Sequence, residues 1–177
     1  MGAAALVEDV LGRAFDMARQ ATRDLTPEEL LRPPKPHIAW LTWHMARVQD
    51  ANFSGLLERE QLWIREAWHA RFNMPANPRD YGSGHRQTPA QVDAFTVSDK
   101  QLIYDYMDAV FDQTRTYLAT VADQDLSRVL NEPRYQPLPT LSIRFASVIT
   151  CNTRHAGQIE YLRGLIKQGG WFSALEK

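Results

Sequence analysis

Apolar residues recur every three to four positions over long stretches of this chain, and no stretch alternates strictly between apolar and polar residues. The first pattern is typical of amphipathic helices, whereas strict alternation would indicate strands. Long helices are expected at about 3–24, 36–58, 99–122 and 140–168, with shorter helical pieces after Thr26, at 61–72 and at 88–95. The pattern therefore predicts an all-α fold, a four-helix bundle with short extra helices in its connections.

Most of the predicted helix ends carry recognisable signals. Thr26 and Thr88 are each followed by proline and, three residues on, by Glu or Gln, which is the pattern of a capping box. Ser98 is expected to cap the third long helix, and Thr140 stands just before the fourth. The fourth helix should end at Gly169–Gly170, because glycine commonly terminates helices.

Each long helix has a stripe of residues that the helical period places on one face. The stripes expected to face the core are Leu6, Val10, Ala14, Met17 and Ala21; Ile38, Leu41, Met45 and Val48; Leu102, Tyr106, Ala109 or Val110, Gln113 and Tyr117; and Ile143, Val148, Ile149, Ile159, Leu162 and Ile166. No internal repeat, low-complexity tract or linker composition divides the chain, so residues 1–177 are expected to form a single domain.

Composition narrows the class of protein. With 20 Lys and Arg against 21 Asp and Glu, the formal net charge is -1, which disfavours nucleic-acid binding. The single cysteine excludes an intramolecular disulfide framework and suits a reducing cytoplasm. No apolar run approaches the roughly 20 residues of a membrane helix. The N-terminal segment carries acids where a secretion signal needs basic residues. We therefore expect a cytoplasmic protein that binds neither nucleic acid nor membrane.

Side chains with metal-binding chemistry stand on two of the predicted helices. Cys151, His155 and Gln158 are spaced i, i+4 and i+7, so they share one face of the last helix beside its apolar stripe. His44 has an equivalent position on the second long helix. Two histidines from different helices can therefore meet inside the bundle, with a thiol one turn away. Imidazole binds zinc, nickel, copper or iron, and thiolate favours softer ions such as zinc.

The same residues have an interpretation that needs no metal. A Cys/His pair one turn apart occurs often by chance. A buried histidine can bond to a backbone carbonyl or a carboxylate, and a buried cysteine can pack as a small apolar side chain. The spacing alone leaves both interpretations open.

Two segments resemble a known family. Residues 40–48, WLTWHMARV, resemble the second-helix motif of the DinB-like superfamily, and residues 153–163, TRHAGQIEYLR, resemble its fourth-helix motif. The resemblance implies a four-helix bundle that binds a divalent metal through one histidine of helix two and two histidines of helix four. It also implies kinship with thiol-dependent enzymes, the mycothiol- and bacillithiol-dependent transferases and maleylpyruvate isomerase, in which the metal activates a low-molecular-weight thiol.

By position in these motifs, His44 matches the helix-two ligand and His155 the second helix-four ligand. The first helix-four ligand, usually histidine and in some relatives glutamate, falls on Cys151. Cysteine would shift the selectivity towards zinc, although the substitution is equally compatible with a member that has lost its metal. Some relatives carry histidine where Gln158 stands.

Other polar residues flank the predicted site. His37, Gln158 and Arg163 are expected to line a pocket, with His37 partly exposed in the first turn of its helix. Arg163 could bind a substrate carboxylate bidentately or form a surface salt bridge. Asp50 and Glu160 could each orient a histidine, but solvent exposure is their default.

The residues and the resemblance together predict a metal-dependent enzyme of the DinB-like superfamily. Its site would consist of His44, Cys151 and His155, hold a divalent metal (zinc or nickel), and act on a small-molecule substrate as a thiol-dependent S-transferase or hydrolase. The alternative is a metal-free helical bundle that binds a small ligand or serves in a stress response. A homodimer is expected in either case.

Overall fold

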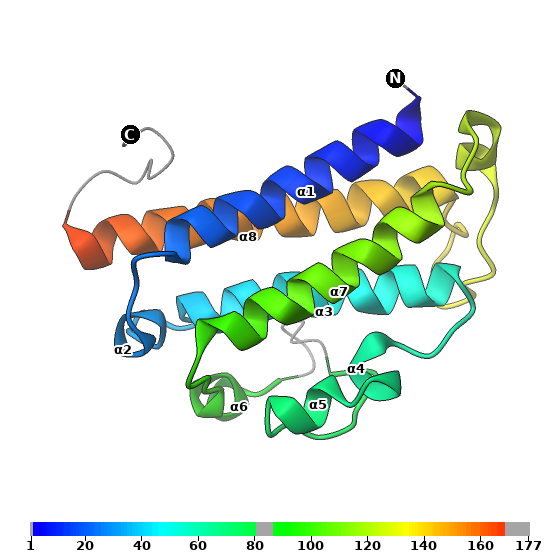
Figure 1. Ribbon diagram of the computed structural model, residues 1–177. Helices are drawn as coiled ribbons and strands as arrows, with labels where there is room; N and C mark the ends of the chain where they lie inside the picture. Colours follow the sequence, from blue (N-terminus) through cyan, green and yellow to red (C-terminus); the bar gives the residue numbers. More distant parts are fainter. Residues whose placement is uncertain (1, 81–86, 169–177) are drawn as a thin grey trace.

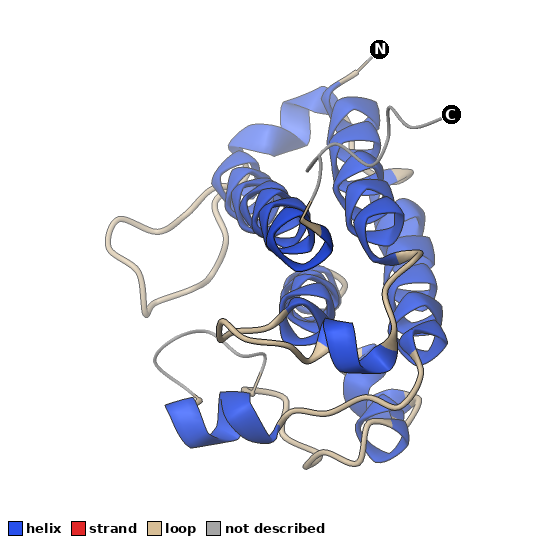
Figure 2. Cartoon of the chain, turned by 90° about the vertical axis from the view of Figure 1, so that its left-hand side faces the viewer, coloured by secondary structure: helices blue, strands red, loops and turns tan. Residues whose placement is uncertain are grey.

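The computed structural model describes residues 2–80 and 87–168, and within these ranges the chain is helical without a strand. The long helices are α1 (Ala3–Thr22), α3 (Ile38–Leu56), α7 (Lys100–Leu118) and α8 (Leu141–Lys167). Helix α8 packs against α1 and α3, and α7 packs against the same two helices from the other side. Figure 1 shows that α1 and α8 run in one direction and α3 and α7 in the other, and Figure 2 views the bundle from one end. The predicted all-α bundle is confirmed.

The connections hold short elements: α2 (Pro27–Leu30), α4 (Leu62–Arg65), α5 (Trp68–Arg71), α6 (Pro89–Ala94) and the 3-10 helix η1 (Asp123–Ser127). The continuous piece predicted at 61–72 is wrong, because it is divided into α4 and α5. Ala67 stands between the two with a φ of 53°, a left-handed conformation that no α-helix continues through.

The capping signals are confirmed in most places. Thr26 and Thr88 form complete capping boxes, and the Thr140 side chain accepts a hydrogen bond from the backbone of α8. The cap expected at Ser98 is wrong. Asp99 takes that position instead, and its carboxylate accepts a 2.8 Å hydrogen bond from the Gln101 backbone N–H. The glycine terminus expected at 169–170 lies outside the described residues.

Two residues of the predicted core stripes, one on α1 and one on α8, are exposed. Leu6 and Ile143, both expected to be buried, are 50% and 56% exposed. Ala14 and Ala21 of the predicted stripe are buried, and Val7, Leu11, Phe15 and Ala18 complete the buried side of α1. Because α1 packs against both α7 and α8, its buried surface is wider than one narrow stripe and is centred about one residue further along.

A buried polar network contradicts the exposure expected for Asp50. Its carboxylate is fully buried and accepts 2.9 Å hydrogen bonds from the backbone N–H groups of Leu62 and Trp63 at the start of α4. The Tyr106 hydroxyl donates to it at 2.7 Å, and the equally buried Arg47 lies 3.5 Å away. Asp50 therefore fixes α4 and α7 on α3 and orients no histidine of the predicted site.

No helix among residues 2–80 and 87–168 combines the length and the apolar composition needed to cross a membrane.

Candidate metal centre

The three residues predicted as metal ligands lie together between α3 and α8, which pack against each other. His44 projects from α3 and is buried, whereas Cys151 and His155 are one turn apart on α8 and half-buried. Their ligand atoms all lie within 4.8 Å of one another. The Cys151 Sγ is 3.8 Å from His44 Nε2, and the two imidazole rings stand edge to face with centroids 4.8 Å apart. The convergence that the sequence predicted is therefore present.

This donor set fits a divalent metal. Zinc–sulfur bonds of about 2.3 Å and zinc–nitrogen bonds of about 2.0–2.1 Å in a tetrahedron place neighbouring ligand atoms roughly 3.3–3.6 Å apart. The 3.8 Å between sulfur and nitrogen exceeds this by a few tenths of an ångström, and because the ligand atoms spread over up to 4.8 Å, a bound ion would draw them closer together. Two imidazoles and one thiol also match the ligand preference of zinc. Three protein ligands would leave one coordination position for water or a substrate.

Neighbouring side chains fix the orientation of both imidazoles. The Gln158 side-chain oxygen accepts a 2.6 Å hydrogen bond from His155 Nδ1, so Nε2 is the nitrogen with a lone pair to offer an ion. His44 is stacked against the Trp40 indole, with ring centroids 4.8 Å apart and planes 10° from parallel. The indole is held in turn by a 2.8 Å hydrogen bond to Gln87. Preorganised ligands of this kind strengthen metal sites.

Burial favours the uncharged forms of Cys151 and His155 when no ion is bound. It raises the pKa of the Cys151 thiol to about 11, against a smaller opposite effect of Arg154. Burial also lowers the pKa of His155, although the hydrogen bond that His155 donates to Gln158 opposes this effect. A bound divalent cation would reverse the preference of the thiol, because coordinated thiols are deprotonated. Without an ion, the thiol of Cys151 and the imidazole of His155 therefore bring no negative charge to the site.

A buried ladder of three hydrogen-bonded polar side chains, two amides and one hydroxyl, lies next to the site. It was not predicted from the sequence. Asn152, beside Cys151, donates a 2.7 Å hydrogen bond to Gln49 on α3, and Gln49 donates a 2.9 Å hydrogen bond to Thr114 on α7. All three side chains are buried. The ladder fixes the register of α3, α7 and α8 where the metal ligands meet. Its only sequence signal is that polar residues occupy positions in phase with the core.

The structure places two of the predicted pocket residues away from the ligands. His37 is fully buried, so the partly exposed role expected for it is wrong. Its Nδ1 accepts a hydrogen bond from the Trp40 backbone as the N-cap of α3, while its Nε2 bonds to the Phe95 carbonyl. Arg163 forms a 3.0 Å ion pair with Asp24 at the end of α1. It stands two turns beyond His155, about 12 Å along α8.

Gln158 does line a cavity, a small one of about 200 Å3 beside the candidate metal centre. The other lining residues are Pro34, Lys35, Pro36, Leu41, Tyr161 and Leu162. Glu160, expected to be exposed, is buried, and burial raises its pKa. The exposure predicted for Glu160 is wrong because this residue lies on the side of α8 that packs into the bundle.

Comparisons with known proteins agree with this geometry. A sequence model described as the DinB superfamily matches residues 11–159. A crystal structure of a conserved protein from Enterococcus faecalis superimposes with a TM-score of 0.85 at 29% sequence identity, over 96% of this chain and 99% of that one. No functionally curated protein matches the chain.

Proposed function

Because the chain belongs to the DinB superfamily, we propose that His44, Cys151 and His155 bind a divalent metal, zinc or nickel, for an enzyme reaction. The observation that carries the proposal is the convergence of the three ligand atoms within 4.8 Å, although His44 stands more than 100 positions before Cys151 and His155. A chance pair on one helix surface would not bring a third ligand from α3. The soft sulfur ligand favours zinc over harder ions.

The proposed reaction is the transfer of a group to a low-molecular-weight thiol, or hydrolysis by water. A bound metal would supply Lewis acidity that lowers the pKa of a thiol or water in its open position. The chain itself contributes orientation. Gln158 holds the His155 ring through its Nδ1, and the Trp40 indole covers one face of the His44 ring, which shields that side from water.

The small cavity beside Gln158 supports a compact small-molecule substrate. Its walls are mostly apolar, from Leu41, Leu162 and the neighbouring prolines, and Lys35 gives it one cationic side chain. Cavities of roughly 150–200 Å3 accommodate a group the size of a single ring. We further propose that the protein works as a homodimer, as the family resemblance suggests, and in the cytoplasm, which suits its single cysteine.

The metal-free alternative has one observation in its favour. Burial keeps the Cys151 thiol protonated, which suits a cysteine that serves as a packed apolar side chain. In that case the interior would hold a small ligand without an ion.

An activity assay on metal-loaded protein distinguishes the two proposed functions. Protein purified without a histidine tag is loaded with zinc or nickel and assayed for transfer to several low-molecular-weight thiols and for hydrolysis. We expect metal-dependent turnover that is lost in His155→Ala. His69→Ala is the matched control, because His69 is also half-buried but lies on α5 against Trp63. Equal activity in both variants would contradict the proposal.

A further inference from the structure

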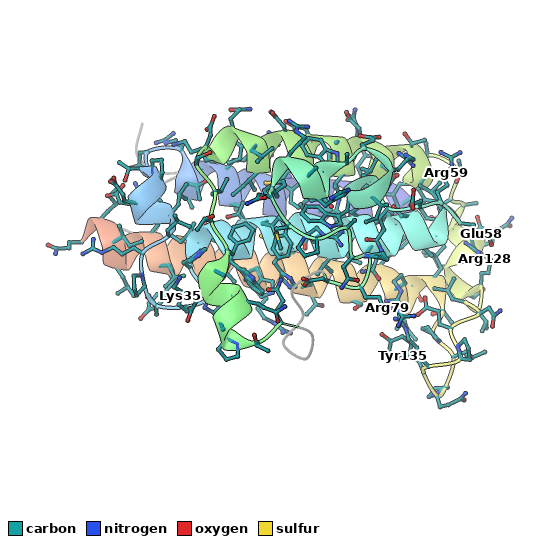
Figure 3. All side chains as sticks on the ribbon, turned by 90° about the horizontal axis from the view of Figure 1, so that it is seen from below. Lys35, Glu58, Arg59, Arg79, Arg128 and Tyr135 are labelled. Carbon is teal, nitrogen blue, oxygen red and sulfur yellow. The ribbon has the colours of Figure 1, made fainter. Side chains whose placement is uncertain are left out.

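A second, larger cavity lies at the end of the bundle where α3 ends and α8 begins. It has a volume of about 470 Å3 and is bounded by α3, α8 and the connection that follows η1. Figure 3 shows Glu58, Arg128 and Tyr135 at this end of the molecule. Val129, one of its lining residues, is 59% exposed, so the cavity opens to solvent. The volume falls in the range of sites for small metabolites.

Two guanidinium groups are held side by side in the cavity wall. Arg144 and Arg134 both form ion pairs with the carboxylate of Glu132, and both lie over the ring of Tyr135, at 5.7 Å and 4.9 Å from its centroid. Arg144 is also fixed by a 2.8 Å hydrogen bond to Asn52 on α3. One carboxylate thus serves two arginines, so a single negative charge compensates two positive ones.

The remaining charges leave the cavity positive. Besides Arg134 and Arg144, it is lined by Arg128, whose guanidinium donates a 2.9 Å hydrogen bond to the Tyr117 hydroxyl. The only acids among the lining residues that the structure describes are Glu58 and Glu132, so three positive charges face two negative ones. Planar guanidinium groups match the oxygen spacing of carboxylate and phosphate groups.

We propose that this cavity binds a small anion with carboxylate or phosphate oxygens, held by Arg128, Arg134 and Arg144. The anion supplies the negative charge that Glu132 alone does not provide to its two arginines. The site is separate from the metal ligands, because Asn52 lies eight residues beyond His44, about 12 Å along α3. Binding here therefore does not depend on the proposed enzyme function.

The test is calorimetric titration of the metal-free protein with succinate and, separately, with inorganic phosphate. Arg134→Gln removes one charged contact and is expected to weaken binding about tenfold or more. Arg134 is half exposed, so the fold should tolerate the change. The matched control is Arg115→Gln, because Arg115 also pairs with an acid, Asp112, and lies over a ring, Phe111, but on the outer side of α7. His155→Ala should bind as the wild type does.

Binding of succinate alone would show that the site takes carboxylates, and binding of phosphate alone would show that it takes phosphates. Two results would overturn the proposal. One is no binding of either anion at millimolar concentration. The other is equal weakening by Arg134→Gln and Arg115→Gln, because that would show a general effect of net charge and no defined site.

Discussion

Replacement of Asp50 by asparagine should destabilise the protein strongly, because it removes the charge that compensates Arg47. Both side chains are fully buried, and the guanidinium lies 3.5 Å from the carboxylate. The carboxylate also accepts hydrogen bonds from two backbone N–H groups of α4 and from Tyr106. An amide presents an NH2 group to some of these donors, so their partner is lost as well. Breaking a buried ion pair on one side costs about 3–5 kcal/mol.

The assay is urea unfolding followed by circular dichroism, with thermal unfolding beside it. For a domain of this size, the loss corresponds to a fall in Tm of roughly 6–20 °C. Asp112→Asn is the control, because Asp112 forms an exposed ion pair with Arg115, and it should change stability by less than about 0.5 kcal/mol. Tyr106→Phe in a double-mutant cycle with Asp50→Asn should show a clear coupling energy. A loss below about 1 kcal/mol for Asp50→Asn would show that the Asp50 carboxylate does not compensate the charge of Arg47.

Three further predictions follow from single contacts. Gln158→Leu should weaken metal affinity about 10- to 100-fold, because His155 loses the acceptor that orients it, and chelator competition measures the effect. Asp99→Ala should cost about 1 kcal/mol in urea unfolding, whereas Ser98→Ala should cost little; the reverse order would contradict the cap assignment. Burial lowers the pKa of His37 in the native state below 6.5. As the pH falls below 6.5, the unfolded state therefore binds more protons than the native state does. Below pH 6.5 the stability of the wild type should therefore fall by up to about 1.4 kcal/mol per pH unit more than that of His37→Asn; parallel curves would refute this.

Local signals predicted the helices well where the stabilising contact is itself local. Thr26 and Thr88 cap their helices through residues three positions on, so a short window of sequence contains both partners. The site was predictable for a related reason. Cys151 and His155 share a face of one helix at a fixed spacing, and His44 lies in a stripe that faces the core, so helix geometry brings them together.

The failures concern residues whose partners are distant in the sequence. From the sequence, Asp50 is predicted to be a surface acid. In the fold, two backbone N–H groups of α4, 12 and 13 residues later in the chain, donate hydrogen bonds to its carboxylate. Ile143 reads as a core residue, yet the same helix buries Asn152 and Glu160, so apolarity does not mark the buried side of α8. Periodicity assumes one apolar face per helix, and a helix that buries polar groups against two neighbours violates that assumption.

The central claim is that His44, Cys151 and His155 form one divalent-metal site. Its most direct test is the metal content of tag-free protein after incubation with zinc and removal of free ions, measured by elemental analysis. We expect about one zinc ion per chain, lost in His44→Ala and in Cys151→Ala and retained in His69→Ala. Absence of bound metal from the wild type, or full retention by the two ligand variants, would contradict it.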